Sequence, residues 1–157
     1  MSNSDYSPLA LALGRMPSGL YIVTTSGSDG PLGFVGSFVA QVGLEPPTVC
    51  VAVGKDRTHL AAMRSSGRFA LSILDGDSSG IMKPFFQKGG DPFAELETAR
   101  TAAGSTVLSG ALAWIDCSVT GEHEIGDHVV VFGVAEEGSL QREGDPKVHL
   151  RKNGLGY

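Results

Sequence analysis

A strict alternation of side chains in the last third of the chain limits the fold more than any other feature. Over residues 115–122 the odd positions are apolar or small and the even positions are polar. A period of two is typical of a β-strand with one buried face. The pair Gly126-Asp127 that follows suits a type II′ hairpin turn, and residues 128–134 form an apolar partner strand. The sequence therefore predicts a long antiparallel hairpin.

The rest of the chain is typical of short strands separated by frequent turns. Glycine makes up 22 of the 157 residues, about twice its ordinary share of roughly 7%. Further strands are expected at 20–25, 33–42, 48–53 and 68–74, and short helices after Ser7-Pro8, from about residue 56 to Gly67, and after Asp91-Pro92. With no regular alternation of strands and helices, the sequence predicts a mainly β fold. We expect an antiparallel barrel with peripheral helices, in a single domain over residues 1–157.

The charge balance and the chain ends argue against several classes of protein. The 12 Lys and Arg residues against 17 Asp and Glu give a net charge of −5, so we expect no nucleic-acid partner. The first seven residues carry no basic side chain and no long apolar stretch follows. We therefore expect no signal peptide, no membrane span and a cytoplasmic location. Cys50 and Cys117 lie far apart in apolar runs, which favours buried thiols.

Most enzyme signatures are missing from the sequence. It has no G-x-G-x-x-G after a strand, no G-x-x-x-x-G-K-[ST] loop and no G-x-S-x-G elbow. A Rossmann, P-loop or α/β-hydrolase site is therefore not expected. His123 and His128 have Gly126 between them and do not fit the i, i+4 spacing of helical zinc ligands. We expect no metal site.

Two segments carry residue types that a ligand site needs. Gly36-Ser37 is a small-residue gap among bulky residues, where backbone N–H groups and a hydroxyl can face a ligand. The alternative is a glycine-bent barrel strand without a ligand. Residues 55–58, Lys-Asp-Arg-Thr, lie where a strand meets the start of a helix. They could hold a phosphate or form a solvated loop.

Three other places allow either a functional or a structural interpretation. His128 follows the hairpin turn and is either an ordinary turn histidine or a site residue. Lys83 and Phe86, in the run Lys-Pro-Phe-Phe, put a cation beside flat aromatic surface. That surface could cover a planar ring or pack in the core. The basic residues near the end of the sequence are typical of a solvated face: Lys147, Arg151 and Lys152.

Taken in order, these segments resemble the flavin reductase-like family, which has the FMN-binding split-barrel fold. The resemblance covers about residues 12–157. It is carried by MPSGLYIVTT (16–25), GFVGSFVAQVGLEPP (33–47), KDRTHLAAMRSSGRFALSIL (55–74), ALAWIDCSV (111–119) and GDHVVVFGVAEEG (126–138). Two further segments look most like the flavin reductase module fused to flavodiiron proteins: KPFFQKGGDPFAEL (83–96) and VHLRKNGLGY (148–157).

The resemblance implies a homodimer of six-stranded antiparallel Greek-key barrels that bind FMN, or FAD, near the subunit interface. NADH or NADPH would pass a hydride to the flavin, which would then serve an acceptor protein of the oxygenase or flavodiiron type. Motif positions imply that His128 approaches the nicotinamide path, and Lys83 and Phe86 are candidates to cover the flavin. The flavin and its phosphate arm would be lined by Val35, Gly36, Ser37 and Phe38, with the phosphate held by Arg57 and Thr58.

Hydride transfer through a bound flavin needs no nucleophile or metal from the protein, so the missing motifs agree with this chemistry. Val35 and Phe38 stand where many members of the family have hydroxyl or amide side chains, and we expect fewer side-chain hydrogen bonds to the flavin. The leading prediction is an NAD(P)H-dependent flavin reductase. Three alternatives stay open: an FMN-binding electron carrier of the flavoredoxin type, a split barrel that holds haem, a deazaflavin or pyridoxal phosphate, and an interaction barrel with no small ligand.

Overall fold

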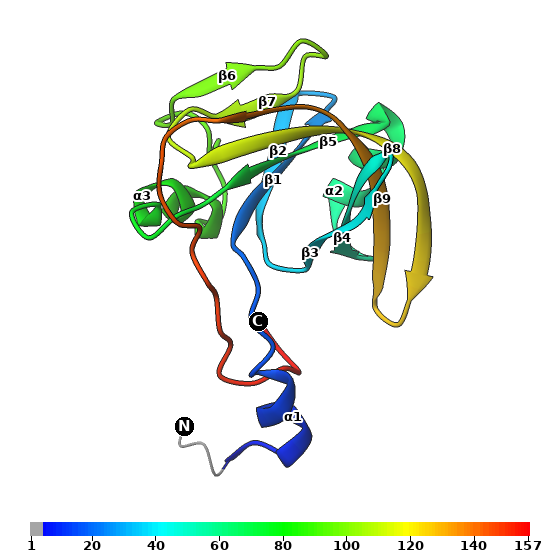
Figure 1. Ribbon diagram of the computed structural model, residues 1–157, viewed down its shortest axis with the longest axis vertical. Helices are drawn as coiled ribbons and strands as arrows, with labels where there is room; N and C mark the ends of the chain where they lie inside the picture. Colours follow the sequence, from blue (N-terminus) through cyan, green and yellow to red (C-terminus); the bar gives the residue numbers. More distant parts are fainter. Residues whose placement is uncertain (1–4) are drawn as a thin grey trace.

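The computed structural model describes residues 5–157 and contains an antiparallel sheet that curls into a barrel (Figure 1). In sheet order its seven strands are β2 (Gly30–Gly36), β1 (Tyr21–Gly27), β5 (Arg68–Ile73), β8 (Ala113–Ile125), β9 (His128–Leu140), β4 (Pro47–Gly54) and β3 (Val39–Leu44). Only Ser37 and Phe38 separate β2 from β3, so a bend joins the two ends of this order. Counted as one bent strand, β2 and β3 leave six strands. The predicted mainly β barrel is confirmed.

The predicted hairpin in the last third is the longest pair of strands. β8 and β9 pair antiparallel from Ala113 opposite Leu140 to Ile125 opposite His128. Gly126, in the turn, has a φ of +54°, and the first central position of a II′ turn requires a positive φ. The register shifts twice along β8. Such bulges bend a strand, and here they let the hairpin follow the curve of the barrel.

Short helices lie outside the barrel wall. α1 (Pro8–Leu13) begins at Ser7, whose hydroxyl oxygen accepts the Ala10 N–H at 3.2 Å. α2 (Thr58–Ser66) ends at Gly67 with a φ of +66°, the usual glycine conformation after a helix. α3 (Ser79–Met82) and the 3₁₀ helix η2 (Lys83–Phe86) follow β5. Among residues 5–157, no helix combines the length and the apolar composition that a membrane crossing requires.

Two local expectations from the sequence are wrong, and one small sheet is not predicted. Asp91-Pro92 begins a turn instead of a helix, because the Asp91 carboxylate accepts the Phe93 N–H at 2.9 Å, a local bond that competes with helix formation. The single strand expected over 33–42 is broken at the bend between β2 and β3. The small sheet of β6 (Thr98–Arg100) and β7 (Thr106–Leu108) has no counterpart in the sequence-based prediction.

The core consists of two clusters of buried side chains. The first fills the barrel and the space under α2, around Met63, Phe69 and Val131. The second connects β1 to α3, η2 and β7, around Ile22 and Leu108. Residues on both sides of the bend between β2 and β3 pack in these clusters, so buried side chains support the bend.

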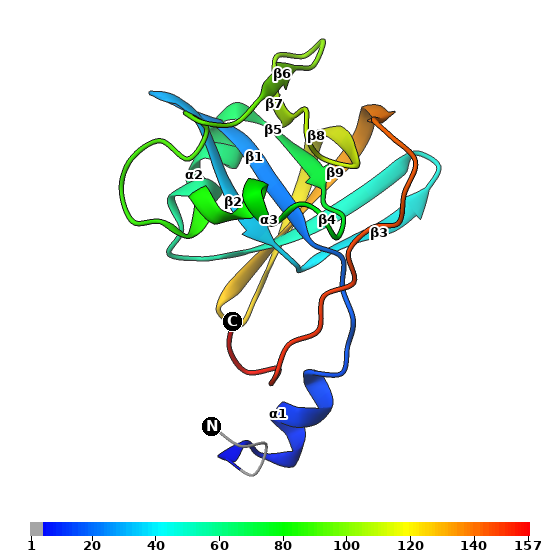
Figure 2. The same cartoon turned by 90° about the vertical axis from the view of Figure 1, so that its left-hand side faces the viewer.

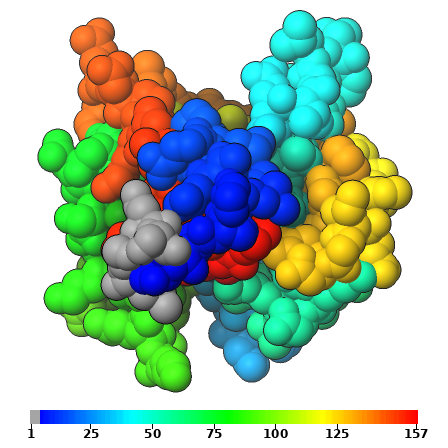
Figure 3. Space-filling model, turned by 90° about the horizontal axis from the view of Figure 1, so that it is seen from below, coloured from blue at the N-terminus to red at the C-terminus, as the bar shows by residue number. Residues whose placement is uncertain are grey.

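The two ends of the described chain pack against each other below the barrel (Figures 1 and 2). The tail, which we define as residues 147–157, runs beside residues 16–18, and Ser18 and His149 exchange backbone hydrogen bonds of 3.1 and 2.7 Å. The Gly154 N–H donates to the Ala10 carbonyl in α1 at 2.7 Å. Seen from below, α1 and the tail lie side by side across this end of the molecule (Figure 3). The tail therefore ties α1 to the barrel.

Candidate functional site

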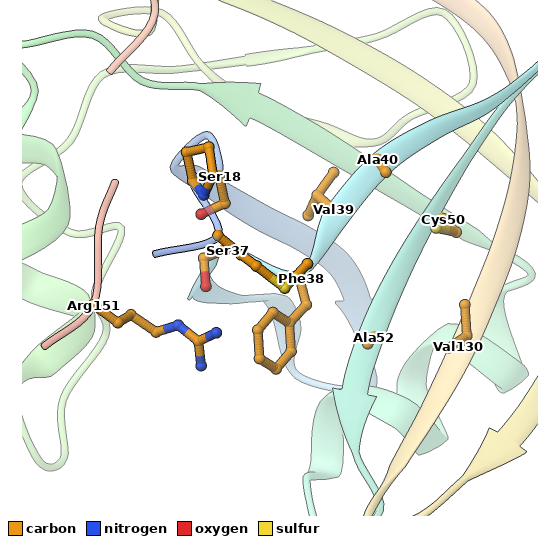
Figure 4. A pocket seen from close by; sticks show the side chains of 11 residues that line it. Ser18, Ser37, Phe38, Val39, Ala40, Cys50, Ala52, Val130 and Arg151 are labelled. Carbon is orange, nitrogen blue, oxygen red and sulfur yellow. The ribbon is translucent and has the colours of Figure 1, made fainter. Parts of the chain in front are cut away.

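A pocket of about 380 Å³ lies beside the bend between β2 and β3 (Figure 4). Its walls are mostly apolar, and its polar groups include the hydroxyls of Ser18 and Ser37 and the guanidinium of Arg151, which points towards Phe38 in Figure 4. We call it the apolar pocket. Its lining residues are Met16, Pro17, Ser18, Ser37, Phe38, Val39, Ala40, Cys50, Ala52, Val130 and Arg151.

The alternation of β4 builds one wall of this pocket. Val51 and Val53 are buried in the barrel core, while Cys50 and Ala52 between and beside them are half-buried on the opposite face. Residues 48–53 are therefore not covered equally on both faces, and the expectation that Cys50 is a fully buried thiol is wrong. The small side chains of Cys50 and Ala52 leave the space that the apolar pocket occupies.

A second pocket, of about 620 Å³, lies between the end of β4, the start of α2 and the turn from β8 to β9. We call it the polar pocket, because four of its seven lining residues are Lys, Arg or Asp. Its lining residues are Gly54, Lys55, Asp56, Arg57, Asp127, His128 and Tyr157. A pocket with this lining suits a charged group of a ligand.

Three aromatic rings connect the two pockets. Phe38 lines the apolar pocket, whereas His128 and Tyr157 line the polar pocket. The ring centroid of Phe38 lies 5.6 Å from that of His128 and 5.7 Å from that of Tyr157. The Arg151 guanidinium lies 5.0 Å from the Phe38 centroid, within the range of a cation–π contact. Phe38 therefore lines one pocket and contacts two residues that line the other.

Arg57 is the cation of the polar pocket that is available to a ligand. The ammonium of Lys55 pairs with Glu124, whereas Arg57 has no ion pair within residues 5–157. Its guanidinium lies 5.6 Å from the Phe34 ring centroid, and its backbone precedes α2 as the N-cap residue. A guanidinium held in this way can bind a phosphate through two parallel hydrogen bonds.

The structure brings together four of the site residues that the sequence predicts. Ser37 and Phe38 line the apolar pocket, and Arg57 and His128 line the polar pocket. The contact between Phe38 and His128 joins the two groups. Their roles towards a flavin and a nicotinamide stay predictions.

Two more predicted residues have packing roles that explain them without a ligand. A Cβ on Gly36 would lie 2.9 Å from Cγ2 of Val23, which is inside the barrel, so close packing alone requires glycine there. Val35 packs against the second core cluster. Neither residue lines the apolar or the polar pocket.

The remaining predicted residues lie apart from these pockets. Thr58, Lys83 and Phe86 are exposed and belong to the lining of neither pocket. Within the Lys-Pro-Phe-Phe run, Phe85 is the ring that packs inward, edge-on to Phe93 with centroids 5.3 Å apart. A role for Thr58, Lys83 or Phe86 in flavin binding stays a prediction.

Sequence reasoning misses two residues of the tail. Arg151 and Tyr157 belong to a segment that is typical of a solvated basic face, yet Arg151 is half-buried and each residue lines a pocket. The pairing of Ser18 with His149 joins distant parts of the chain, which no local pattern can predict. The one available signal is the family resemblance, because it extends through residues 148–157.

The two thiols differ in a way that can locate a ligand. Burial, together with nearby Asp116, raises the pKa of Cys117 to about 12, whereas Cys50 is half-buried at the wall of the apolar pocket. We expect a neutral alkylating reagent at about pH 8 to modify Cys50 and to spare Cys117. Saturating FMN should slow the modification of Cys50, measured by mass spectrometry. A Cys50→Ser variant is the control, and an equal rate with and without FMN would place the flavin elsewhere.

The two pockets together fit a planar heteroaromatic ring that carries a phosphate arm, as FMN does. The apolar walls can contact the faces of the ring, and the hydroxyls of Ser18 and Ser37 can hydrogen-bond to its polar edge. Arg57, in the polar pocket, can hold the phosphate. Arg151 adds a second positive charge close to Phe38.

Comparison with known proteins gives one family and several relatives. Residues 13–154 match the domain family described as "Flavin reductase like domain". The chain is 37% identical over 156 residues to diflavin flavoprotein A 1 of Synechocystis, a match that covers 96% of this chain and 27% of that protein. The chain therefore spans about a quarter of the length of the diflavin flavoproteins that it matches.

Two solved structures have the same fold. Nitrilotriacetate monooxygenase component B from Mycobacterium thermoresistibile superposes with a TM-score of 0.84 at 32% identity, covering 90% of this chain and 80% of that one. An NADH:FAD oxidoreductase from Streptomyces globisporus superposes with a TM-score of 0.81 at 25% identity, covering 90% of this chain and 86% of that one.

Proposed function

Because the chain belongs to the flavin reductase-like domain family, we propose that it is an NAD(P)H-dependent flavin reductase that binds FMN. The observation that carries this proposal is the arrangement of an apolar and a polar pocket on either side of the Phe38 contacts, with Arg57 free of ion pairs in the described chain. One structural relative is named as an NADH:FAD oxidoreductase, which supports a nicotinamide co-substrate.

The protein's own part in this reaction is to bind, orient and shield. When bound, the flavin supplies a ring that accepts a hydride from the nicotinamide. Ser37 would hydrogen-bond to the ring edge, and the walls formed by Val39, Ala52 and Val130 would keep water away from it. Arg57 would hold the phosphate and so fix the ring by its arm.

His128 is proposed to seat the nicotinamide or the edge of the flavin ring. Its imidazole lies in the polar pocket and makes an edge-on contact with Phe38, the residue that belongs to the apolar pocket. A nicotinamide stacked on a ring in the apolar pocket would therefore lie close to His128. Holding the two rings in this order would supply the proximity that hydride transfer requires.

We also propose that the protein is a homodimer. β3 is an edge strand, with Leu44 82% exposed and Val42 53% exposed, and Met16, which lines the apolar pocket together with Val39 and Ala40 of β3, is 63% exposed. An apolar edge strand left open favours pairing with another chain. Light scattering should give a mass about twice the 16.3 kDa of one chain, and Leu44→Asp should lower the mass to that of one chain. A single-chain mass for the unchanged protein would contradict the proposal.

The acceptor of the reduced flavin is proposed to be an oxygenase. The relative named as component B of a monooxygenase supports this proposal, since a two-component oxygenase takes reduced flavin from a separate reductase. The resemblance of residues 83–96 and 148–157 to the flavin reductase module of flavodiiron proteins makes a flavodiiron acceptor the competing choice. Adding either class of acceptor to the reductase reaction distinguishes the two, because only the true acceptor should consume oxygen in a coupled manner.

The proposed activity is tested by steady-state oxidation of NADH and of NADPH with FMN, FAD or riboflavin added. We expect at least one nucleotide and one flavin to give a rate well above that of the reaction without protein. Bound flavin with no nucleotide oxidation would instead identify an electron carrier. If no flavin binds at all, the flavin assignment itself is wrong.

A further inference from the structure

The imidazole of His128 is hydrogen-bonded at both nitrogens. Nδ1 lies 2.7 Å from Oδ1 of Asp127, and Nε2 lies 2.6 Å from the hydroxyl of Tyr157. Asp127 is the neighbouring residue in the hairpin turn, whereas Tyr157 comes from the tail. A ring held at both ends cannot rotate or flip without losing both bonds, so these two partners fix the orientation of His128.

The chemistry of the two partners also selects one tautomer of neutral His128. The hydrogen bond to His128 lowers the pKa of Asp127, so this carboxylate is ionised and can only accept. Tyr157 is 83% exposed, and a tyrosine phenol keeps its proton near neutral pH, so its hydroxyl can donate. Both bonds form only when Nδ1 carries the hydrogen and Nε2 accepts from the Tyr157 hydroxyl.

The tail holds Tyr157 in this place through contacts made before it along the chain. The Gly154 N–H donates to the Ala10 carbonyl at 2.7 Å, and the Arg15 guanidinium donates to the Arg151 carbonyl at 3.0 Å. A Cβ on Gly154 would lie only 2.0 Å from Cβ of Leu13, so the tail packs on α1 with no room for a side chain. Tyr157 is therefore delivered to His128 by an anchored segment.

The ring of Tyr157 completes the arrangement. It lies against Phe38, with centroids 5.7 Å apart, and both Arg57 and Arg151 act electrostatically on its hydroxyl. The phenol thus stands between the two pockets, beside the two cations that are available to anionic ligands. Hydride transfer from a nicotinamide to a flavin needs neither a proton donor nor a nucleophile at this position. The role that the contacts indicate for the Tyr157 hydroxyl is its hydrogen bond to Nε2 of His128.

We propose that Tyr157 is a positioning residue, whose hydroxyl holds the His128 imidazole, with Asp127, in the orientation that receives the nicotinamide ring. The contacts alone support the orientation of His128, whereas the effect of this orientation on nicotinamide binding rests on the proposed function. The tail is then part of the site, although it lies far from His128 along the sequence.

The first test is the ¹⁵N NMR spectrum of the four histidine rings, with His128 assigned from a His128→Gln variant. Tyr157→Phe removes the hydroxyl and keeps the ring. We expect it to shift the Nε2 resonance of His128 and to leave the other three histidines unchanged. Gly154→Val should produce the same shift without altering Tyr157, because it displaces the tail from α1. Tyr21→Phe, a hydroxyl removed outside both pockets, is the matched control. An unchanged Nε2 resonance in both tail variants would overturn the proposal.

The second test is kinetic and separates this proposal from the proposed function. In active protein, Tyr157→Phe should raise KM for the nicotinamide nucleotide about fivefold, the effect of one hydrogen bond, with a much smaller change in kcat. An unchanged KM would overturn the positioning role. If the Nε2 resonance shifts as expected but the unchanged protein oxidises neither NADH nor NADPH, the contact stands and the reductase proposal fails.

Discussion

Replacing Asp116 with alanine should lower the free energy of unfolding by about 3–5 kcal/mol, measured by urea denaturation. The Asp116 carboxylate is fully buried in β8. It accepts hydrogen bonds from the hydroxyls of Thr101 at 2.6 Å and Ser105 at 2.7 Å, and it lies 3.1 Å from the Arg68 guanidinium. Alanine would leave two buried hydroxyls without their acceptor and would remove the buried partner of the Arg68 guanidinium.

The matched control is Glu136→Ala. Glu136 pairs with the same Arg68 guanidinium at 2.7 Å, but its side chain is 48% exposed. An exposed ion pair contributes less than about 1 kcal/mol, so we expect a correspondingly small loss of stability. A loss for Asp116→Ala that is no greater than the loss for Glu136→Ala would show that the buried network does not stabilise the loop between β6 and β7.

The second large effect is expected for Arg57→Ala on flavin affinity. If Arg57 binds the phosphate of FMN through a charge-assisted hydrogen bond, that bond contributes about 1.5–3 kcal/mol. Replacing Arg57 with alanine should therefore raise the dissociation constant for FMN roughly 10- to 150-fold. Riboflavin has no phosphate, so its affinity should change less than about twofold by the same scale. Quenching of flavin fluorescence during titration measures both dissociation constants.

Two variants control for the charge and the position of Arg57. Arg64 lies on α2 and pairs with Glu122 at 2.7 Å, so Arg64→Ala should leave both flavins bound as before. Lys55→Ala should have a smaller effect on FMN than Arg57→Ala, because the Lys55 ammonium is already paired with Glu124. Equal losses for FMN and riboflavin in Arg57→Ala would refute the phosphate assignment.

The sequence predicts well those parts of the fold that depend on neighbouring residues. The alternation of β8, the turn at Gly126 and the glycine end of α2 at Gly67 depend on neighbouring residues, and the structure confirms them. The bend at Ser37-Phe38 is a tertiary feature. Gly36, directly before it, allows a bent strand, as the sequence indicates, but no local preference shows that the chain passes there from one edge of the sheet to the other.

The residues of the site fall into the same two groups: those that a local pattern marks and those that only tertiary packing brings to the site. Ser37, Arg57 and His128 belong to segments whose composition or motif marks them as candidates, and the structure places them in the two pockets. Tyr157 and Arg151 reach the site only because the tail packs on α1. That packing depends on the space around Gly154, and a single sequence does not reveal which distant residue fills it.

The same limit applies to α1. The spacing of Leu9, Leu13 and Met16 favours one face of a helix, but α1 ends at Leu13 and leaves Met16 outside it. Leu9 and Met16 are each 63% exposed, and Ala10 is the buried residue of the helix. α1 packs on the tail instead of on the barrel, so its apolar face meets no core of its own chain. The proposed second copy of the chain would cover it.

The most direct test of flavin reduction at this site is anaerobic mixing of the unchanged protein, holding one equivalent of FMN, with NADH or with NADPH. We expect the visible absorbance of the oxidised flavin to disappear in a single phase, at a rate that saturates as one of the two nucleotides is increased. Saturation would show that the nucleotide binds before it reacts. Bound FMN whose absorbance stays unchanged with both nucleotides would contradict the assignment of this chain as an NAD(P)H-dependent flavin reductase.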